Sequence, residues 1–328
     1  MNNFRQIAWN TGIAALIALP WLSDSSYLQH LLVIWGIYCL FALSLNLVVG
    51  FLGELSFAHA AFFGVGAYAS AILSKNLDWP LWLAMPTAVL AAAVCGALIG
   101  YVLLRVIGHQ FAILSLAFGA VIYTITNYWV DFTNGPLGIS NIAMPSVALW
   151  FDADSPARGY YYLVLLMLLL VIYYSVSLLA SGTGRAFLAI RENLPLAQAV
   201  GVNPFRFRLI GFTTSAAIAG VAGTLYAHYV RVITPELMSL NYMVAAIIMV
   251  MIGGRGTILG PMIGAAIYVG LLELLRATGS LRMIVFSLLM TGCIVFLPGG
   301  LISLWARLRA ARGGGDDERL KTPGAANG

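Results

Sequence analysis

The chain has 328 residues, of which 61% are hydrophobic and only 9% are charged. A mean hydropathy of +0.92 is too high for one soluble core, so the composition predicts an integral membrane protein in a lipid bilayer. The net charge of +5 is spread between apolar runs and forms no basic face with interleaved aromatic residues. This pattern argues against nucleic acid as a partner.

Apolar runs separated by polar, glycine or proline punctuation predict an all-α polytopic membrane protein with about ten transmembrane helices. The expected spans are residues 6–22, 28–50, 55–74, 80–104, 111–130, 159–180, 209–230, 240–253, 258–275 and 283–304. Two of them, 55–74 and 240–253, contain polar residues or are short, so each is expected to be a full span, a half-span or a broken helix. Residues 1–306 therefore form a single membrane domain, and the glycine-rich, mixed-charge stretch 307–328 is expected to be a flexible tail.

The distribution of lysine and arginine predicts the orientation in the membrane. If the N-terminus is cytoplasmic, 12 of the 17 basic residues fall in the connections on that side. Cytoplasmic connections carry such an excess in membrane proteins. Both termini, the tail and the long polar connection 181–208 are therefore expected in the cytoplasm.

Sequence motifs for catalysis are missing from the chain. It has no Walker-type phosphate loop, no GxSxG elbow and no HExxH motif, and its four histidines are dispersed. We therefore expect no enzymatic activity, no cofactor and no metal. The ionisable residues within or beside spans are Glu54, His59 and Glu273, which are interpreted either as charges at helix ends or as functional groups.

Small residues recur at helical spacing in two of the expected spans, and two glycines occur together in a third. Such stripes are explained either by close helix packing or by a helix interface that moves and acts as a gate. The residues are Gly256, Gly260 and Gly264, the milder set Ala216, Gly220 and Thr224, and the pair Gly64 and Gly66. A polar translocation path would include Asn46, His59 and Asn127, although hydrogen bonds between helices explain the two asparagines equally well.

The connection 181–208 contains local signals for a short helix. Asn193 is a suitable N-cap, Pro195 stands in an allowed early position, and Gly201 suits the left-handed residue after a helix end. These signals predict a helix over residues 194–200, and Asn203 with Pro204 repeats the start signal for the next span. A helix this short is marginal alone, so it must dock on a partner, on the chain's own helices or on lipid headgroups.

Three stretches carry a resemblance to a known family. They are residues 43–73 (LSLNLVVGFLGELSFAHAAFFGVGAYASAIL), 184–226 (GRAFLAIRENLPLAQAVGVNPFRFRLIGFTTSAAIAGVAGTLY) and 252–261 (IGGRGTILGP), with 112–127 also similar. They resemble the permease subunits of ABC importers for branched-chain amino acids, in particular the LivM-like half of the pair. Glu54 departs from that pattern, because glutamine is common there.

The resemblance implies a type II ABC importer-like permease of the inner membrane, in which the 181–208 connection couples to an ATP-hydrolysing subunit. Pro195 and Gln198 depart from the coupling motif, whereas four residues fall on it: Glu192, Ala197, Ala199 and Gly201. The full set of residues expected to couple to the ATPase is Arg191, Glu192, Leu194, Leu196, Ala197, Val200 and Gly201.

The implied function is the import of branched-chain or related hydrophobic amino acids by ATP-driven alternating access. The implied partners are a homologous second permease subunit, two ATP-binding subunits and a periplasmic solute-binding protein. An ion- or proton-coupled secondary transporter of a small polar solute is the alternative, with 55–74 and 240–253 as its broken helices. A membrane-embedded enzyme is weakened by the lack of clustered catalytic groups.

Overall fold

The computed structural model describes residues 16–21, 25–145 and 156–276, and the single residues 288, 292 and 301. Five described helices are long and apolar enough to cross a membrane. They are α2 (Ser26–Asn46, continued by the π-helical segment η2, Leu47–Leu52), α4 (Leu81–Leu103), α5 (His109–Tyr128), α8 (Pro156–Ala180) and α11 (Pro204–Val230). These helices confirm five of the predicted spans.

The remaining described elements are shorter. The helices are α3 (His59–Asn76), α6 (Val130–Thr133), α9 (Gly182–Glu192), α10 (Leu194–Ala199), α12 (Leu240–Gly253) and α13 (Leu259–Leu274). Three 3₁₀ turns are η1 (Leu19–Trp21), η3 (Gly135–Leu137) and η4 (Pro235–Met238), and the strands β1 (Ile139–Ser140) and β2 (Val232–Ile233) pair in antiparallel register.

The two spans expected to be unusual are short helices. The helix expected at 55–74 begins only at His59, and α12 has 14 residues. At 1.5 Å per residue α12 is about 21 Å long, less than a bilayer core of about 30 Å. The first and tenth predicted spans and the tail 307–328 lie outside the described residues, except for residues 16–21, 288, 292 and 301.

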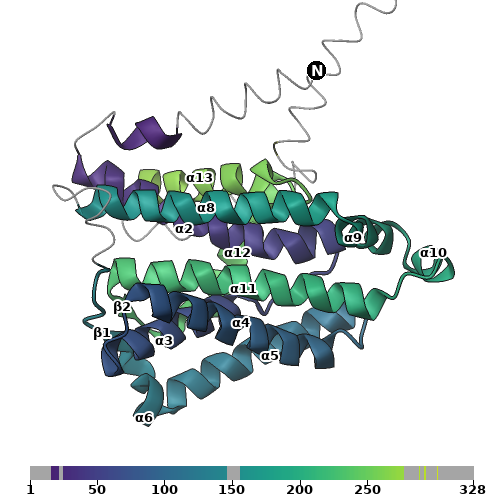
Figure 1. Ribbon diagram of the computed structural model, residues 1–328, viewed down its shortest axis with the longest axis horizontal. Helices are drawn as coiled ribbons and strands as arrows, with labels where there is room; N and C mark the ends of the chain where they lie inside the picture. The colour runs from purple at the N-terminus through teal and green to yellow at the C-terminus, as the bar shows by residue number, and fades with distance from the viewer. Residues whose placement is uncertain are drawn as a thin grey trace, which may run out of the picture.

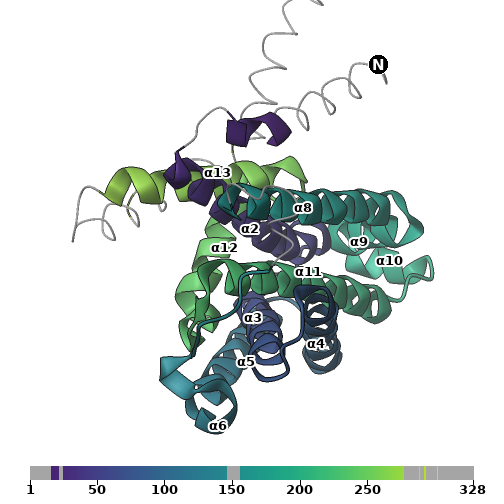
Figure 2. The same cartoon turned by 60° about the vertical axis from the view of Figure 1, so that its left-hand side comes forward.

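Helix α11 lies at the centre of the bundle. It packs against α3 and α4 on one side and α2 on the other, and α8 and α13 pack on α2 (Figures 1 and 2). Small residues permit the close crossing of α3 and α11: a Cβ added to Gly66 would lie 2.5 Å from the Gly220 Cα. The Thr224 hydroxyl donates to the Gly66 carbonyl oxygen at 3.3 Å. These contacts show close helix packing at Gly66, Gly220 and Thr224, and a role of the stripe as a gate stays a prediction.

The second small-residue stripe is shorter than predicted. Helix α13 begins at Leu259, and Gly256 precedes it in a turn with φ +77°. The expectation that all three glycines line one helix face was therefore wrong. Gly260 and Gly264 do face α12, where an added Cβ would meet the backbone of Gly253 and Met249. Gly64 instead faces Met238 of η4.

The connections between helices alternate between two ends of the bundle. One end, which we call the α10 end, contains residues 53–58, 104–108, 181–203 and 254–258. Side-chain bonds described below join these connections to the start of α11, to the end of α2 or to η2. The other end contains residues 77–80, 129–145 and 231–239, including the β1–β2 pair. Each described connection thus lies on the side that the predicted alternation requires. That the α10 end is the cytoplasmic one, as the charge distribution indicates, stays a prediction.

Candidate coupling site at the α10 end

Helix α9 was not predicted, and it anchors the connection to the bundle. The Ser181 hydroxyl accepts a hydrogen bond from the Thr183 N–H at 3.2 Å and caps the helix start. Gly184, Phe187 and Ile190 recur every three residues and are buried. Phe187 is 0% exposed and packs in the cluster that contains Leu52 and Phe212. This apolar spacing was a signal for the helix, but two early glycines obscured it.

Helix α10 follows after Asn193 alone and has the caps that the sequence predicts. The Asn193 Oδ1 accepts a hydrogen bond from the Leu196 N–H at 3.0 Å. The helix ends at Ala199, with Val200 as its C-cap, and Gly201 follows at φ +87°. The predicted bounds 194–200 are therefore correct to one residue.

Helix α10 presents apolar side chains outward. Ala197 is 2% exposed and faces the bundle, whereas Leu196 is 61% and Val200 72% exposed. Leu194 is half-buried, and Glu192 is exposed at the end of α9. In Figure 1 the helix projects from one end of the molecule, beyond α9 and α11. A capped helix with an outward apolar face has the form of a docking element for another protein.

Arg191, also predicted to couple to the ATPase, turns back toward its own chain. Its Nη1 donates to the Gly50 carbonyl oxygen of η2 at 2.6 Å. A Cβ added to Gly53 would lie 2.9 Å from the Arg191 Cγ, and a Cβ added to Gly256 would lie 2.8 Å from the Arg191 Nη1. Glycine at these two positions, both with positive φ, leaves room for the arginine against the backbone. Arg191 thereby ties α9 to the π-helical end of α2.

Asn46 joins the glycine-rich turn, residues 254–258, to the same end of α2. Its Oδ1 accepts from the Gly256 N–H at 2.9 Å, and its Nδ2 donates to the Thr257 carbonyl oxygen at 2.8 Å. His59, also fully buried, bonds through Nδ1 to the Ser56 hydroxyl at 3.1 Å and through Nε2 to Ser215. Asn127 lies at the far end of α5. The structure does not bring these three predicted path residues together, and their role in translocation stays a prediction.

Arg208 forms a buried ion pair that sequence reasoning missed. Its Nη2 lies 2.7 Å from the Glu54 Oε1, and the side chains are 2% and 12% exposed. The same guanidinium donates to the carbonyl oxygens of Leu104 at 3.1 Å and Val106 at 3.2 Å. Burial raises the pKa of the Glu54 carboxyl, and the charge and hydrogen bond of Arg208 oppose that rise. The sequence placed Arg208 at the end of the polar connection 181–208, with no signal for a partner.

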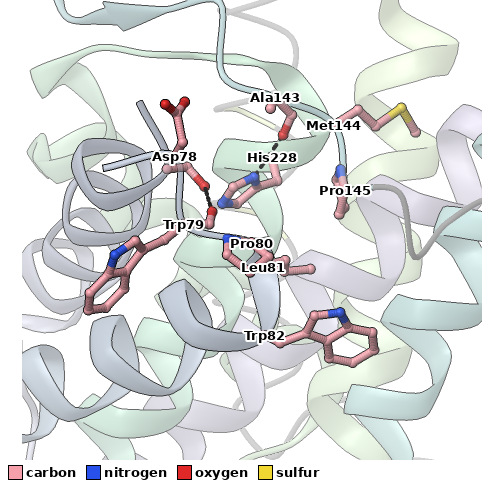
Figure 3. A pocket seen from close by; sticks show the side chains of 10 residues that line it. Asp78, Trp79, Pro80, Leu81, Trp82, Ala143, Met144, Pro145 and His228 are labelled. Atoms are coloured by element: carbon pink, nitrogen blue, oxygen red, sulfur yellow. Dashed lines mark hydrogen bonds between the residues drawn. The ribbon is translucent and has the colours of Figure 1, made fainter. Parts of the chain in front are cut away.

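A pocket of about 240 Å³ lies at the opposite end of the bundle (Figure 3). Asp78, Trp79, Trp82 and Met144 are among its lining residues, and the buried His228 of α11 donates from Nδ1 to the Ala143 carbonyl oxygen at 2.9 Å. Figure 3 shows the imidazole between this segment and the turn before α4. No group of three potential metal ligands occurs among the described residues.

Comparison with known proteins agrees with this architecture. The family described as branched-chain amino acid transport system / permease component matches residues 27–297. The high-affinity branched-chain amino acid transport system permease protein LivM of Escherichia coli (strain K12) is 30% identical, covering 82% of this chain and 68% of its own length. LivH of the same organism is 28% identical over 81% of this chain and 91% of its own length.

A probable branched-chain amino acid transport permease protein LivM of Methanocaldococcus jannaschii is 24% identical, covering 84% of this chain and 93% of its own length. No solved structure gives a significant match. Because the family matches more than half of the chain, and a relative with 30% identity aligns over most of it, the family is established. The chain belongs to the permease components of branched-chain amino acid transport systems.

Proposed function

We propose that this chain is the membrane-spanning permease subunit of an ABC importer that carries branched-chain or related hydrophobic amino acids into the cytoplasm. The observation that carries the proposal is α10, a capped helix that projects from the bundle with Leu196 and Val200 exposed. A separate subunit hydrolyses ATP, and α10 docks on that subunit. The permease itself has no catalytic role and uses no cofactor.

Transport follows from displacement of α10. Helix α11 starts at Pro204, shortly after α10, and continues without interruption for 27 residues through the centre of the bundle. It packs on α2, α3 and α4, so a shift of its first turn alters their packing together. Closure of the ATPase around ATP would thus select between two packings of the helices, which is the requirement for alternating access.

The full assembly contains this chain, a homologous second permease, two ATP-binding subunits and a periplasmic solute-binding protein, in the bacterial inner membrane. The similarity of this chain to both LivM and LivH, two permease proteins of one organism, supports a second homologous permease. The positive α10 end faces the cytoplasm, where ATP is present.

Uptake into membrane vesicles tests the proposal. Vesicles with the reconstituted assembly should accumulate leucine only when ATP is inside and the solute-binding protein is outside, and a protonophore should not reduce uptake. The alternative, an ion- or proton-coupled carrier, requires the reverse pattern. Uptake that continues without ATP and collapses with the protonophore would overturn the proposal.

A further inference from the structure

Arg208 joins four segments of the chain at one point. The residue belongs to α11, and its guanidinium bonds to Glu54 before α3 and to two carbonyl oxygens of the α4–α5 turn. It also lies over the ring of Phe111 in the first turn of α5, 5.8 Å from the ring centroid. The carbonyl groups at the end of α4 lack helical partners, and a cation at a helix C-terminus is favoured.

The position of Arg208 along α11 connects this cluster to α10. Pro204 begins α11, so Arg208 lies about one turn inside the helix. The Asn203 side chain accepts a hydrogen bond from the Arg206 N–H at 3.2 Å and caps that first turn. A displacement of α10 that moves the start of α11 therefore moves the guanidinium with it.

Stability alone is a weak explanation for this ion pair. Removing two charges from water costs several kcal/mol per ion, and well-packed apolar residues of similar volume often replace a buried pair without loss. What the ion pair adds is a fixed geometry between the segments that it joins. The planar guanidinium of Arg208 bonds to several acceptors at once. It holds the Glu54 carboxylate and both carbonyl groups in one geometry, which a flexible apolar contact does not do.

We infer that Arg208 is a positioning residue that carries the displacement of α10 to the start of α3 through Glu54 and to the α4–α5 turn through its carbonyl bonds. The inference rests on the proposed docking of α10 on an ATPase. It concerns a link inside the permease, whereas the proposed function concerns the contact outside it. Without this link the assembly would still hydrolyse ATP, but it would transport less leucine per ATP hydrolysed.

The test is the amount of leucine transported per ATP hydrolysed by the reconstituted assembly. Arg208→Lys keeps the charge but removes the planar fork, and Glu54→Ala removes the acceptor while leaving the carbonyl bonds. Glu54→Gln keeps an acceptor without the charge. Arg105→Met is the matched control, because Arg105 lies in the same α4–α5 turn but is exposed and stacks on Tyr101.

We expect Arg208→Lys and Glu54→Ala to lower the transport-to-hydrolysis ratio about tenfold, in the range typical of coupling between sites. Glu54→Gln should lower it less, and Arg105→Met should leave it unchanged. The amount of assembled complex is measured in parallel. If Arg208→Lys does not assemble, the two Glu54 variants decide the result alone.

Two outcomes distinguish failure of this inference from failure of the proposed function. If the unaltered chain assembles with its ATPase and transports, but the Glu54 and Arg208 variants keep the wild-type ratio, Arg208 has only a structural role and the inference is overturned. The same holds if transport falls only in proportion to the assembled complex. If the unaltered chain binds no ATPase at all, the proposed function fails first.

Discussion

Helices α9 and α10 are neighbours separated by Asn193, yet they relate to the bundle in opposite ways. Four of the 11 residues of α9 are buried, including Phe187, whereas α10 buries only Ala197 among its six. The two large apolar side chains at the outer face of α10 and its C-cap are exposed instead. The difference shows which part of the connection packs on the bundle, and in the proposed function the exposed part is the one presented to a partner.

The caps explain how α10 persists with so little packing. A helix of six residues is unstable alone, because nucleation is costly. Asn193 satisfies an N–H group at its start, and Gly201 supplies the left-handed residue after its end. The helix is therefore formed before any partner binds, which lowers the ordering cost of association.

The largest effect is expected from the double variant Leu196→Glu with Val200→Glu. Buried apolar anchors at protein interfaces are worth about 2 kcal/mol or more each, so affinity for the ATPase subunit should fall roughly 1,000-fold. Membrane insertion should be unchanged, because neither side chain packs in the bundle. Co-purification of the ATPase with the tagged permease measures the loss. Leu188→Glu on α9 is the matched control; an equal loss there would erase the distinction between the two helices.

Phe187→Ala should give the opposite signature. Truncating a fully buried phenylalanine costs about 3 to 5 kcal/mol, so the yield of folded permease and its thermal midpoint should fall. The protein that remains folded should bind the ATPase as the wild type does. Size-exclusion recovery and binding to the ATPase are measured on the same sample. Wild-type stability combined with lost binding would mean that α9 is itself the docking helix.

The sequence predicted α10 better than it predicted α9, for physical reasons. The α10 signals, Asn193, Pro195 and Gly201, act through bonds within a few residues and are readable locally. The α9 apolar stripe begins among glycines that favour other conformations. The bounds of α12 were predicted correctly and those of α13 to one residue. The hydrogen bonds that hold the turn containing Gly256 were not predicted, because they come from Asn46 in a distant part of the chain.

The buried ion pair could not be predicted from the sequence, because it also depends on distant parts of the chain. Counting charges assigns an arginine near a span end to the interface, and nothing in the spacing relates Arg208 to Glu54. Only the packing of α11 against α3 and α4 brings them within 2.7 Å. Residues whose roles depend on distant partners, such as Arg191 at Gly50, were likewise named without their contacts.

A smaller effect is expected at the end of α10 from Gly201→Ala. The left-handed conformation costs a residue with a Cβ about 1 kcal/mol or more, and no atom lies within 4 Å of the added Cβ, so strain rather than collision is measured. Affinity for the ATPase should fall roughly fivefold to tenfold. The affinity of the Gly201→Asn variant for the ATPase should fall less, because asparagine tolerates this conformation. Equal affinities for all three proteins would show that the cap geometry has no part in docking.

The smallest effect is expected from Asn193→Ala. Loss of an N-cap costs about 1 kcal/mol, and α10 has little packing to compensate, so ATPase affinity should fall about fivefold. Asn203→Ala removes an equivalent cap from α11, whose packing along the bundle keeps it helical. Its affinity should equal that of the wild type. A titration of the ATPase subunit against each reconstituted variant measures both; equal losses would mean that caps act on the whole connection alike.

The central claim, that α10 is the surface presented to an ATP-hydrolysing partner, is tested most directly by site-specific crosslinking in native membranes. A photoreactive residue at position 196 or 200 should form an adduct with a subunit that carries ATPase motifs, and the adduct yield should change when ATP is added. The same residue at position 188 of α9 should give little of that adduct. Labelling of lipid alone from positions 196 and 200, with no ATPase adduct, would contradict the account.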